Sequence, residues 1–204
     1  MCYHGRHLNE RPDTMSEVIR TRFQEALSVI AQTQTRLSGR LAAAAEIIIQ
    51  SYRSGGGVFI FGNGGSAADA QHIAGELVGR FLLNRRALKA VALTTDTSVL
   101  TCIANDFDYN SIFARQLEGN ARSGDVAIGL STSGNSANVV AALEYARGNG
   151  IKTIAFTGSG GGKCAALADV LLDVDCAHTP HTQEAHAVMY HILCELVEAT
   201  MAGK

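Results

Sequence analysis

The sequence lacks tryptophan, has little proline, and shows no segment typical of a membrane-spanning or secreted protein. Its 204 residues include no tryptophan and only two prolines. No apolar run approaches the roughly 18 residues that a membrane span needs, and the N-terminus has no apolar signal core. We therefore predict a protein that binds no membrane.

Charge is sparse and of mixed sign. Lys and Arg number 17 and Asp and Glu number 19, which gives a formal net charge of −2, and no run of like charges stands out. Proteins that bind nucleic acid usually carry a basic patch. The charge pattern therefore argues against nucleic acid as a partner.

Cysteine usage indicates a reducing compartment, and we predict a cytoplasmic location. The cysteines form no C-x-x-C pair, and an odd number of distant cysteines does not suit a disulfide framework. The five are Cys2, Cys102, Cys164, Cys176 and Cys194.

What the sequence does contain fits one α/β domain. Hydrophobic residues make up 47% of the chain and glycines number 21, enough for one large core and many strand-to-helix loops. Residues 1–14 are polar and show no periodicity, so we expect a disordered tail there and a single domain over residues 15–204.

Before the first expected strand, apolar residues recur at helical spacing over residues 16–30 and again over residues 37–52. This pattern predicts a hairpin of two helices. An amphipathic hairpin far from the loops is more often a packing or oligomer surface than a catalytic part.

Residues 58–81 predict a strand, a tight loop and a helix. Val58–Gly62 is β-branched and aromatic, and Asn63–Ser66 is a turn that a glycine-rich backbone makes easily. Ser66 and Asp69 have the spacing of a capping box, which predicts that the helix begins at Ser66 with free N–H groups facing the loop. Such a loop is suited to an anion.

The same helix carries His72 and Glu76, four residues apart and therefore on one face. These side chains are suited to acid/base chemistry or to metal binding.

Strands then alternate with helices along the rest of the chain. Alternation of this kind predicts a doubly wound parallel sheet in a three-layer sandwich, with functional loops at the carboxyl ends of the strands. The expected strands are residues 90–94, 126–130, 151–156 and 170–174, and the expected helices are residues 96–103, 110–121, 137–148 and 182–201.

A second loop of small residues, Ser131–Ser136, follows a strand and opens a helix. Hydroxyls, backbone amides and the helix dipole converge there, which favours a phosphate ligand. The alternative is ordinary helix capping by Ser66 and Ser136, which needs no ligand.

A dinucleotide site is a further alternative, because residues 62–67 can be written G-x-G-x-x-A. That fingerprint expects an acidic residue about 20 positions later. The nearest fit, Asp96, lies some thirty residues after Gly64, so we disfavour this interpretation.

The last helix adds Gln183, His186 and His191 to a face that otherwise looks buried. These histidines are either satisfied core residues or part of a site that, with His72 and Glu76, suits a divalent metal such as zinc. Gln183 and His191 lie about 12 Å apart along one unbroken helix. Both can reach one metal only if the helix begins after Gln183 or if two subunits share the site, and we predict the second.

Four motifs together resemble the phosphoheptose isomerases of the sugar-isomerase (SIS) domain class, over residues 16–201. They are GNGGSAADAQHIAGEL, LTTDTSVLTCIANDF, GDVAIGLSTSGNSANV and TQEAHAVMYHI. The resemblance implies conversion of sedoheptulose 7-phosphate to D-glycero-D-manno-heptose 7-phosphate, the first step of ADP- or GDP-heptose biosynthesis and of the heptose in bacterial lipopolysaccharide. It also implies a homotetramer with active sites between subunits, and one zinc ion per subunit.

Carried over by position, the resemblance assigns the site residues. The catalytic pair is Glu76 and His191, and the metal ligands are His72, Glu76, Gln183 and His191. The substrate-binding residues are Asn63, Gly64, Gly65, Ser66, Glu76, Asn105, Asp106, Ser131, Thr132, Ser133, Ser136 and Gln183.

Two departures from the family stand out. Asn84–Lys89 lacks the prolines that relatives usually carry, which predicts a less rigid loop, and His181 and Thr182 replace more usual basic and aliphatic residues.

Two other functions share this class. A similar protein associates with the replication initiator DnaA as a tetrameric binding module, but it lacks the catalytic Glu and the final His. A sugar-phosphate-sensing regulator would carry a DNA-binding domain, for which the N-terminal helices have no basic character. Glu76 and His191 therefore favour the enzyme.

Overall fold

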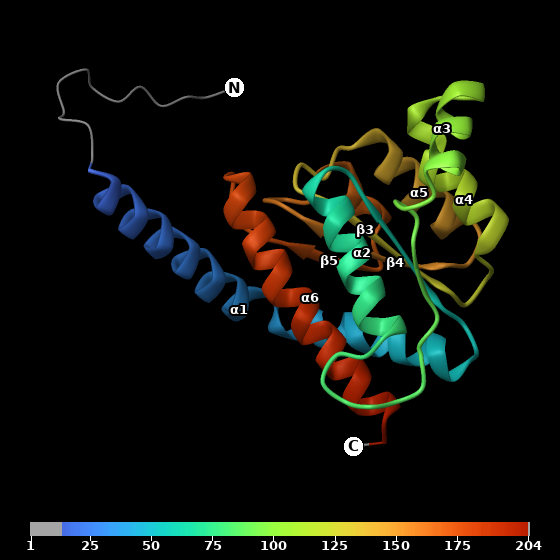
Figure 1. The fold of residues 1–204 in the computed structure, drawn as a ribbon, viewed down its shortest axis with the longest axis horizontal. Coiled ribbons are helices and arrows are strands. Elements are labelled where there is room, and N and C mark those ends of the chain that lie inside the picture. The colour runs from blue at the N-terminus through green and yellow to red at the C-terminus, as the bar shows by residue number, and fades with distance from the viewer. Residues whose placement is uncertain (1–13, 204) are drawn as a thin grey trace.

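Five parallel strands form one sheet in the order β2-β1-β3-β4-β5, with helices on both faces (Figure 1). This arrangement is seen in a computed structural model that describes residues 14–203. The strands are β1 Val58–Gly62, β2 Ala90–Ala92, β3 Val126–Ser131, β4 Lys152–Thr157 and β5 Val170–Asp173. The predicted doubly wound α/β fold is confirmed.

The helices lie in two layers. They are α1 Met15–Arg53, α2 Gly65–Val78, α3 Thr97–Asp106, α4 Ile112–Asn120, α5 Ala137–Gly148 and α6 Thr179–Met201, with short 3-10 helices η1 Tyr109–Ser111 and η2 Gly162–Leu167. Helices α1, α2 and α6 pack on one face of the sheet, and α3, α4 and α5 pack on the other.

The strands are buried on both faces, so alternate residues enter different cores. In β1, Val58 and Ile60 pack under α1, α2 and α6, whereas Phe59 and Phe61 pack under α3, α4 and α5. Period-two alternation with apolar residues on both faces is typical of a parallel sheet covered by two helical layers.

The N-terminal hairpin is a wrong prediction, because residues 15–53 form one continuous helix of 39 residues. Thr14 and Glu17 form a capping box at its start. Residues 31–36, which separate the two apolar stretches, are helical, and the Thr35 and Ser38 hydroxyls donate to carbonyls four residues earlier. The apolar residues of the two halves of α1 differ in burial. The first half projects from the domain (Figure 1), and the buried residues of the helix begin at Thr33.

Other expectations need only small changes. The strand expected at residues 90–94 is shorter, and the helix expected from residue 182 begins at Thr179, with Pro180 in its first turn. Of the expected disordered tail, residues 1–13 lie outside the described residues. Cys102, Cys164, Cys176 and Cys194 are free thiols, and between residues 14 and 203 no helix is long and apolar enough to cross a membrane.

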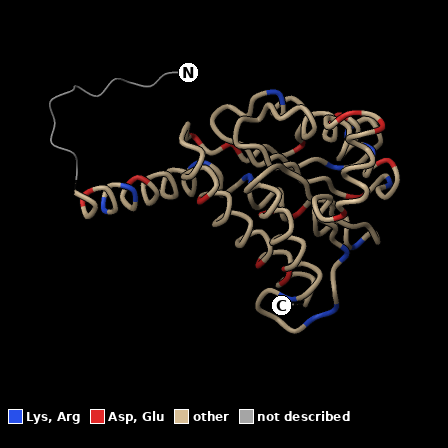
Figure 2. The backbone as a smooth tube through the Cα atoms, turned by 45° about the horizontal axis from the view of Figure 1, so that its top comes forward, with Lys and Arg blue, Asp and Glu red and all other residues tan. Residues whose placement is uncertain are grey.

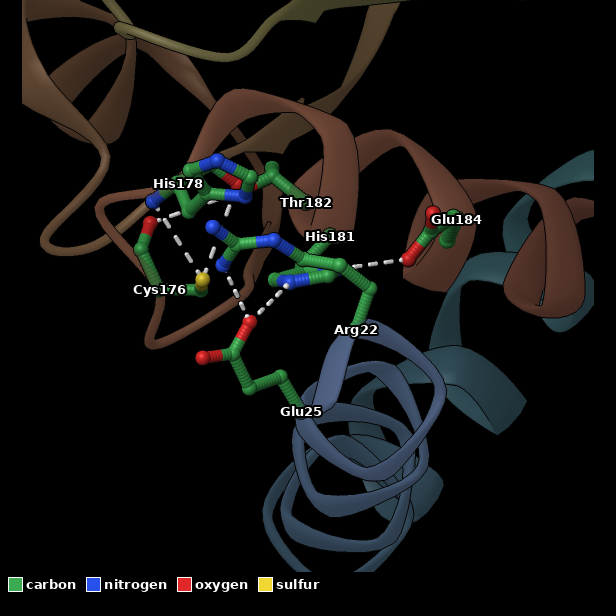
Figure 3. A network of polar contacts seen from close by, with 7 residues as sticks. All are labelled: Arg22, Glu25, Cys176, His178, His181, Thr182 and Glu184. Carbon is green, nitrogen blue, oxygen red and sulfur yellow. Dashed lines mark hydrogen bonds and ion pairs between the residues drawn. The ribbon is translucent and has the colours of Figure 1, made fainter. Parts of the chain in front are cut away.

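A polar network joins the start of α6 to the projecting half of α1 (Figure 3). His181 Nδ1 lies 2.8 Å from Glu184 Oε2, and His181 Nε2 lies 3.2 Å from Glu25 Oε2, which also accepts from Arg22. The hydrogen bond with Glu184, then that with Glu25, raises the pKa of His181 above its usual range. His181 thus connects α6 to α1.

The loop after α2 is held by a buried carboxylate from α6. Glu198 is 1% exposed. It accepts hydrogen bonds from the backbone N–H groups of Phe81, Leu82 and Leu83 at 2.9, 2.6 and 2.8 Å, and lies 3.1 Å from Arg85 Nε. Burial alone would raise the pKa of Glu198, but the three N–H donors and the Arg85 charge lower it overall.

Arg85 holds the same segment from the other side. Its guanidinium donates to the carbonyl oxygens of Glu76 and Leu77 at 2.7 and 2.8 Å. These two carbonyls lie in the last turn of α2, where no N–H group of the helix is available to them. The loop after α2, for which we predicted less rigidity, is therefore tied to α2 and α6 by side chains.

We expect Glu198→Ala to lower the free energy of unfolding by about 3–5 kcal/mol, because it leaves a buried guanidinium and three N–H groups without their acceptor. Urea denaturation at fixed protein concentration measures the loss. The control is Glu195→Ala, an exposed residue on the same helix, which should change stability by less than about 0.5 kcal/mol.

The loss should also depend on pH. Because the folded pKa of Glu198 is lowered, its stabilisation is complete above the pKa of an unfolded Glu and is lost as pH falls through the folded value. The difference between wild type and Glu198→Ala should therefore shrink in acid. Equal effects of the two variants at neutral pH would contradict this account of the loop.

Candidate active site

The two loops of small residues lie side by side at the carboxyl edge of the sheet. Strands β1 and β3 are paired, with Gly62 opposite Leu130, so the loops that follow them are neighbours. The chain moves outward from β1 to β2 on one side and returns to β3 on the other. This is the switch point at which doubly wound sheets bind ligands.

A pair of amides ties the two loops together. Asn63 Nδ2 donates to Asn138 Oδ1 at 2.9 Å, and Asn138 Nδ2 donates to Asn63 Oδ1 at 2.8 Å. Tyr109 also donates to Asn63 Oδ1, at 3.3 Å. Sequence reasoning missed Asn138, although an amide in the first turn of an otherwise apolar helix was a signal, because a buried amide needs a partner.

The hydroxyls of the second loop face one another. Ser131 Oγ lies 2.9 Å from Ser136 Oγ and 3.4 Å from Ser133 Oγ. Ser136 is the N-cap residue of α5, yet its side chain makes no capping hydrogen bond. Simple capping therefore does not account for this serine cluster, whose members lie beside the N-terminus of α5.

The capping box expected for Ser66 and Asp69 is a wrong prediction. Helix α2 begins at Gly65, and its N-cap residue, Gly64, has φ of 56°. Ser66 is buried against β1, where a Cβ on Gly62 would lie 2.9 Å from Ser66 Cβ. Asp69 does not cap the helix; its carboxylate accepts a hydrogen bond from Tyr190 of α6.

The loop after β4 supports the serine loop. Gly158 N–H donates to Thr132 O at 2.9 Å, and Cys164 N–H donates to Gly134 O at 3.0 Å. Gly134 has φ of 64°, and a Cβ there would collide with the carbonyl oxygen of Gly161. Only glycine combines this backbone angle with this close approach.

His72, Glu76 and His191 form a cluster that a metal ion fits. One ligand atom from each lies within 4.8 Å of the others. His72 Nε2 is 3.0 Å from Glu76 Oε1 and 3.3 Å from His191 Nε2. The sequence predicts a site shared between two subunits, but these three side chains come from α2 and α6 of one chain.

Gln183 does not join this cluster within the chain. Helix α6 is unbroken from Thr179, which excludes the alternative in which the helix begins after Gln183. The Gln183 side chain instead packs over Gly65, where an added Cβ would lie 2.5 Å from Gln183 Nε2.

Aromatic rings enclose the two histidines. Phe81 stacks on His191 with ring centroids 5.8 Å apart, and Tyr190 lies edge-on to His72 at 5.3 Å. The Tyr190 hydroxyl lies 3.1 Å from His72 Nδ1 and 3.4 Å from Asp69 Oδ1. Burial raises the pKa of Tyr190 to about 12 and also raises the pKa of Asp69.

His186 is a core residue. It is fully buried, and its Nε2 lies 3.0 Å from the Thr157 carbonyl oxygen. Burial lowers the pKa of His186 to about 4, so the ring is neutral and its Nε2–H donates to that carbonyl.

The remaining predicted residues lie apart from the cluster. Asn105 donates to Asp106 at the end of α3, and within residues 14–203 no hydrogen bond joins either to the two loops. Asp96 accepts from Val99 N–H as the N-cap of α3. The acid that a dinucleotide site would require is thus a helix cap, which disfavours that alternative further.

Comparisons with known proteins agree with this geometry. A family model described as "SIS domain" matches residues 22–158. The phosphoheptose isomerase of Geobacter sp. (strain M21) is 47% identical over 184 residues, which cover 90% of this chain and 96% of that protein.

Solved structures give the same result. Phosphoheptose isomerase GmhA from Neisseria gonorrhoeae matches with a TM-score of 0.87 at 41% identity, over 91% of this chain and 100% of that chain. A phosphoheptose isomerase from Francisella tularensis matches with a TM-score of 0.88 at 31% identity, over 91% of this chain and 99% of that chain.

The fold and the matched family model define a SIS-domain protein. Within that class the chain belongs to the phosphoheptose isomerase family, and it is an isomerase.

We expect Gly134→Ala to destabilise the protein more than Gly160→Ala. Both residues have positive φ, so each alanine costs about 1–2 kcal/mol in backbone strain. Only at Gly134 does the new Cβ meet backbone atoms, which adds about 1–3 kcal/mol. Urea denaturation of both variants measures the difference in the free energy of unfolding. Equal losses of stability would contradict a tight contact between the backbones at Gly134 and Gly161.

Proposed function

We propose that the protein converts sedoheptulose 7-phosphate to D-glycero-D-manno-heptose 7-phosphate, the first step of ADP- or GDP-heptose biosynthesis, in the cytoplasm. The observation that carries this proposal is the contact of Glu76 and His191 with His72, about two helical turns from the glycine-rich start of α2. An acid/base pair thus lies within a sugar's length of an anion-binding loop. The names of the relatives support this substrate.

The phosphate is bound by the serine loop. Ser131, Ser133 and Ser136 offer hydroxyl donors beside the N-terminus of α5, whose first N–H groups have no partner inside the helix. Thr132 belongs to the same loop, and Asn63, Gly64, Gly65 and Ser66 form the adjacent wall. Asn105 and Asp106 are assigned to the sugar by the family resemblance.

The reaction moves a carbonyl between C1 and C2 of the sugar. One group removes the proton from the carbon next to the carbonyl, and another transfers a proton between the two oxygens, through a cis-enediol. We assign the carbon-bound proton to Glu76 and the oxygen-bound proton to His191, since a carboxylate is acceptor-only and an imidazole both donates and accepts.

Zinc suits the donor set of His72, Glu76 and His191, which are two imidazoles and one carboxylate. When bound there, zinc would polarise the substrate carbonyl. A fourth ligand comes from Gln183 of another copy, because Gln183 and His191 lie eight residues apart in the unbroken α6.

A homotetramer accounts for two exposed apolar stripes. Ile19, Phe23 and Leu27 recur every four residues on the projecting half of α1, and Val188, Ile192 and Leu196 do the same on α6. An apolar groove lined by Leu37, Leu41 and Met189 runs between these helices. Copies of this chain that pack through α1 and α6 bury all of these residues and bring a second α6 close to the site.

The DnaA-associated binding module is the second candidate. The contact geometry of Glu76 and His191, which such a module lacks, favours the enzyme. The N-terminal helix shows no cluster of basic residues on its backbone trace (Figure 2), which argues against the other alternative, a sugar-phosphate-sensing regulator that binds DNA.

Purified protein should convert sedoheptulose 7-phosphate to the aldose, and Glu76→Gln and His191→Ala should each lower kcat by at least about 100-fold, since each removes an acid/base group. A coupled assay and exchange of the C1 or C2 hydrogen with solvent give the rates. His178→Ala, an exposed histidine outside the cluster, is the control. Wild-type protein that binds the sugar without exchanging its hydrogen would refute an isomerase acting on this substrate.

The shared site can be tested by complementation. Glu76→Gln and Gln183→Ala should each be inactive alone, whereas co-expressed chains should regain activity in about a quarter of the sites, those that combine an intact Glu76 with an intact Gln183 from a neighbour. Affinity tags of two kinds isolate the mixed oligomers. If mixed oligomers are as inactive as the parents, Gln183 acts within its own chain or not at all.

A further inference from the structure

His72 Nδ1, the ring nitrogen that points away from Glu76 and His191, contacts a relay of two residues, Tyr190 on α6 and Asp69 on α2. Tyr190, buried on α6, places its hydroxyl 3.1 Å from His72 Nδ1. The same hydroxyl lies 3.4 Å from Asp69 Oδ1, one turn before His72 on α2. Neither Asp69 nor Tyr190 belongs to the predicted catalytic or metal-binding residues.

The donors and acceptors of this relay fix the position of a proton. An ionised carboxylate only accepts hydrogen bonds, so the single hydroxyl proton of Tyr190 goes to Asp69. The Tyr190 oxygen must then accept, and the hydrogen between it and His72 comes from Nδ1–H. A neutral imidazole carries one N–H, so Nε2 of His72 is left bare.

The bare nitrogen faces other electron-rich atoms. His72 Nε2 is 3.0 Å from Glu76 Oε1 and 3.3 Å from His191 Nε2. A lone pair directed at a carboxylate oxygen is repulsive unless a cation or a proton lies between them. The relay thus favours a cation at the centre of the three side chains.

We propose that Asp69 and Tyr190 are positioning residues that hold His72 in the Nδ1–H tautomer, with Nε2 directed at the metal-binding centre of the site. The proposal rests on the metal centre of the proposed function. Hydrogen bonds from the outer nitrogen of a ligand histidine commonly fix its tautomer, and losing them typically weakens metal binding 10–100-fold.

Two variants separate the roles of the relay. Tyr190→Phe keeps the ring and removes the hydroxyl, so His72 loses its acceptor and both tautomers become populated. Asp69→Ala frees the Tyr190 proton to donate to His72 Nδ1, which moves the imidazole hydrogen to Nε2, where Glu76 Oε1 accepts it. The second change inverts the tautomer, whereas loss of packing alone would not.

The direct measurement is the ¹⁵N spectrum of histidine-labelled, metal-free protein at pH 8, with the His72 signals assigned by their loss in His72→Gln. Wild type should show His72 with Nδ1 protonated, Tyr190→Phe a mixture, and Asp69→Ala the Nε2–H form. A wild-type His72 that carries its hydrogen on Nε2 would overturn the proposal.

Zinc affinity is the second measurement, made by competition with a chromophoric chelator. Tyr190→Phe and Asp69→Ala should each bind zinc about 10- to 100-fold more weakly than wild type. The matched control is Tyr52→Phe, which removes another hydroxyl, the one that donates to Lys89 O, and should leave the affinity unchanged.

Neither readout depends on catalysis, so the relay can hold even if sedoheptulose 7-phosphate is not the substrate. Circular dichroism and a thermal melt show whether each variant is folded before its affinity is compared. Equal zinc affinity in folded Tyr190→Phe and Tyr52→Phe would refute a positioning role for the hydroxyl.

Discussion

The packing of α6 against α2 is the constraint on which the site depends. Three contacts fix the two helices in register: Gln183 over Gly65 at the start of α2, Tyr190 beside Asp69 and His72 in its middle, and Glu198 under residues 81–83 after its end. Because these contacts run in the same order along both helices, the two helices are parallel (Figure 1). A shift of one turn, about 5.4 Å, would separate His191 from His72.

The contacts between α2 and α6 are polar near both ends and in the middle, and apolar between these points. Ile73, Leu77, Leu193 and Val197 belong to the core under both helices and supply most of the burial. Apolar packing is tolerant of direction, whereas a carboxylate that accepts from three consecutive N–H groups has one position. Glu198 therefore acts on the site at a distance, since the segment it holds includes Phe81, whose ring stacks on His191.

The sequence was sufficient for those parts of the structure that depend on local pattern. Apolar strands, glycine-rich loops and the four-residue spacing of His72 and Glu76 are local, and the structure agrees with each. The hairpin failed because periodicity reports which face is buried and not where a helix ends; α1 changes its burial at Thr33 without a turn.

Contacts between distant segments were beyond the sequence. Asn138 and Tyr190 sit inside helices, where a polar residue gives no sign of its partner, and their partners lie 75 and 118 residues away. The sequence could not show that Asp69 contacts Tyr190, because a spacing of three residues suits a capping box and one face of a helix equally well.

Helix α6 also connects the site to the outer surface of the domain. Gln183, Ala187 and His191 recur every four residues on the face toward α2, and the exposed Val188, Ile192 and Leu196 lie one residue further round the helix. His181 holds the start of α6 to the projecting half of α1, which carries the other exposed stripe. Because one residue of rotation separates His191 from Ile192 on α6, any molecule that covers the exposed stripe of this helix lies next to the histidine cluster.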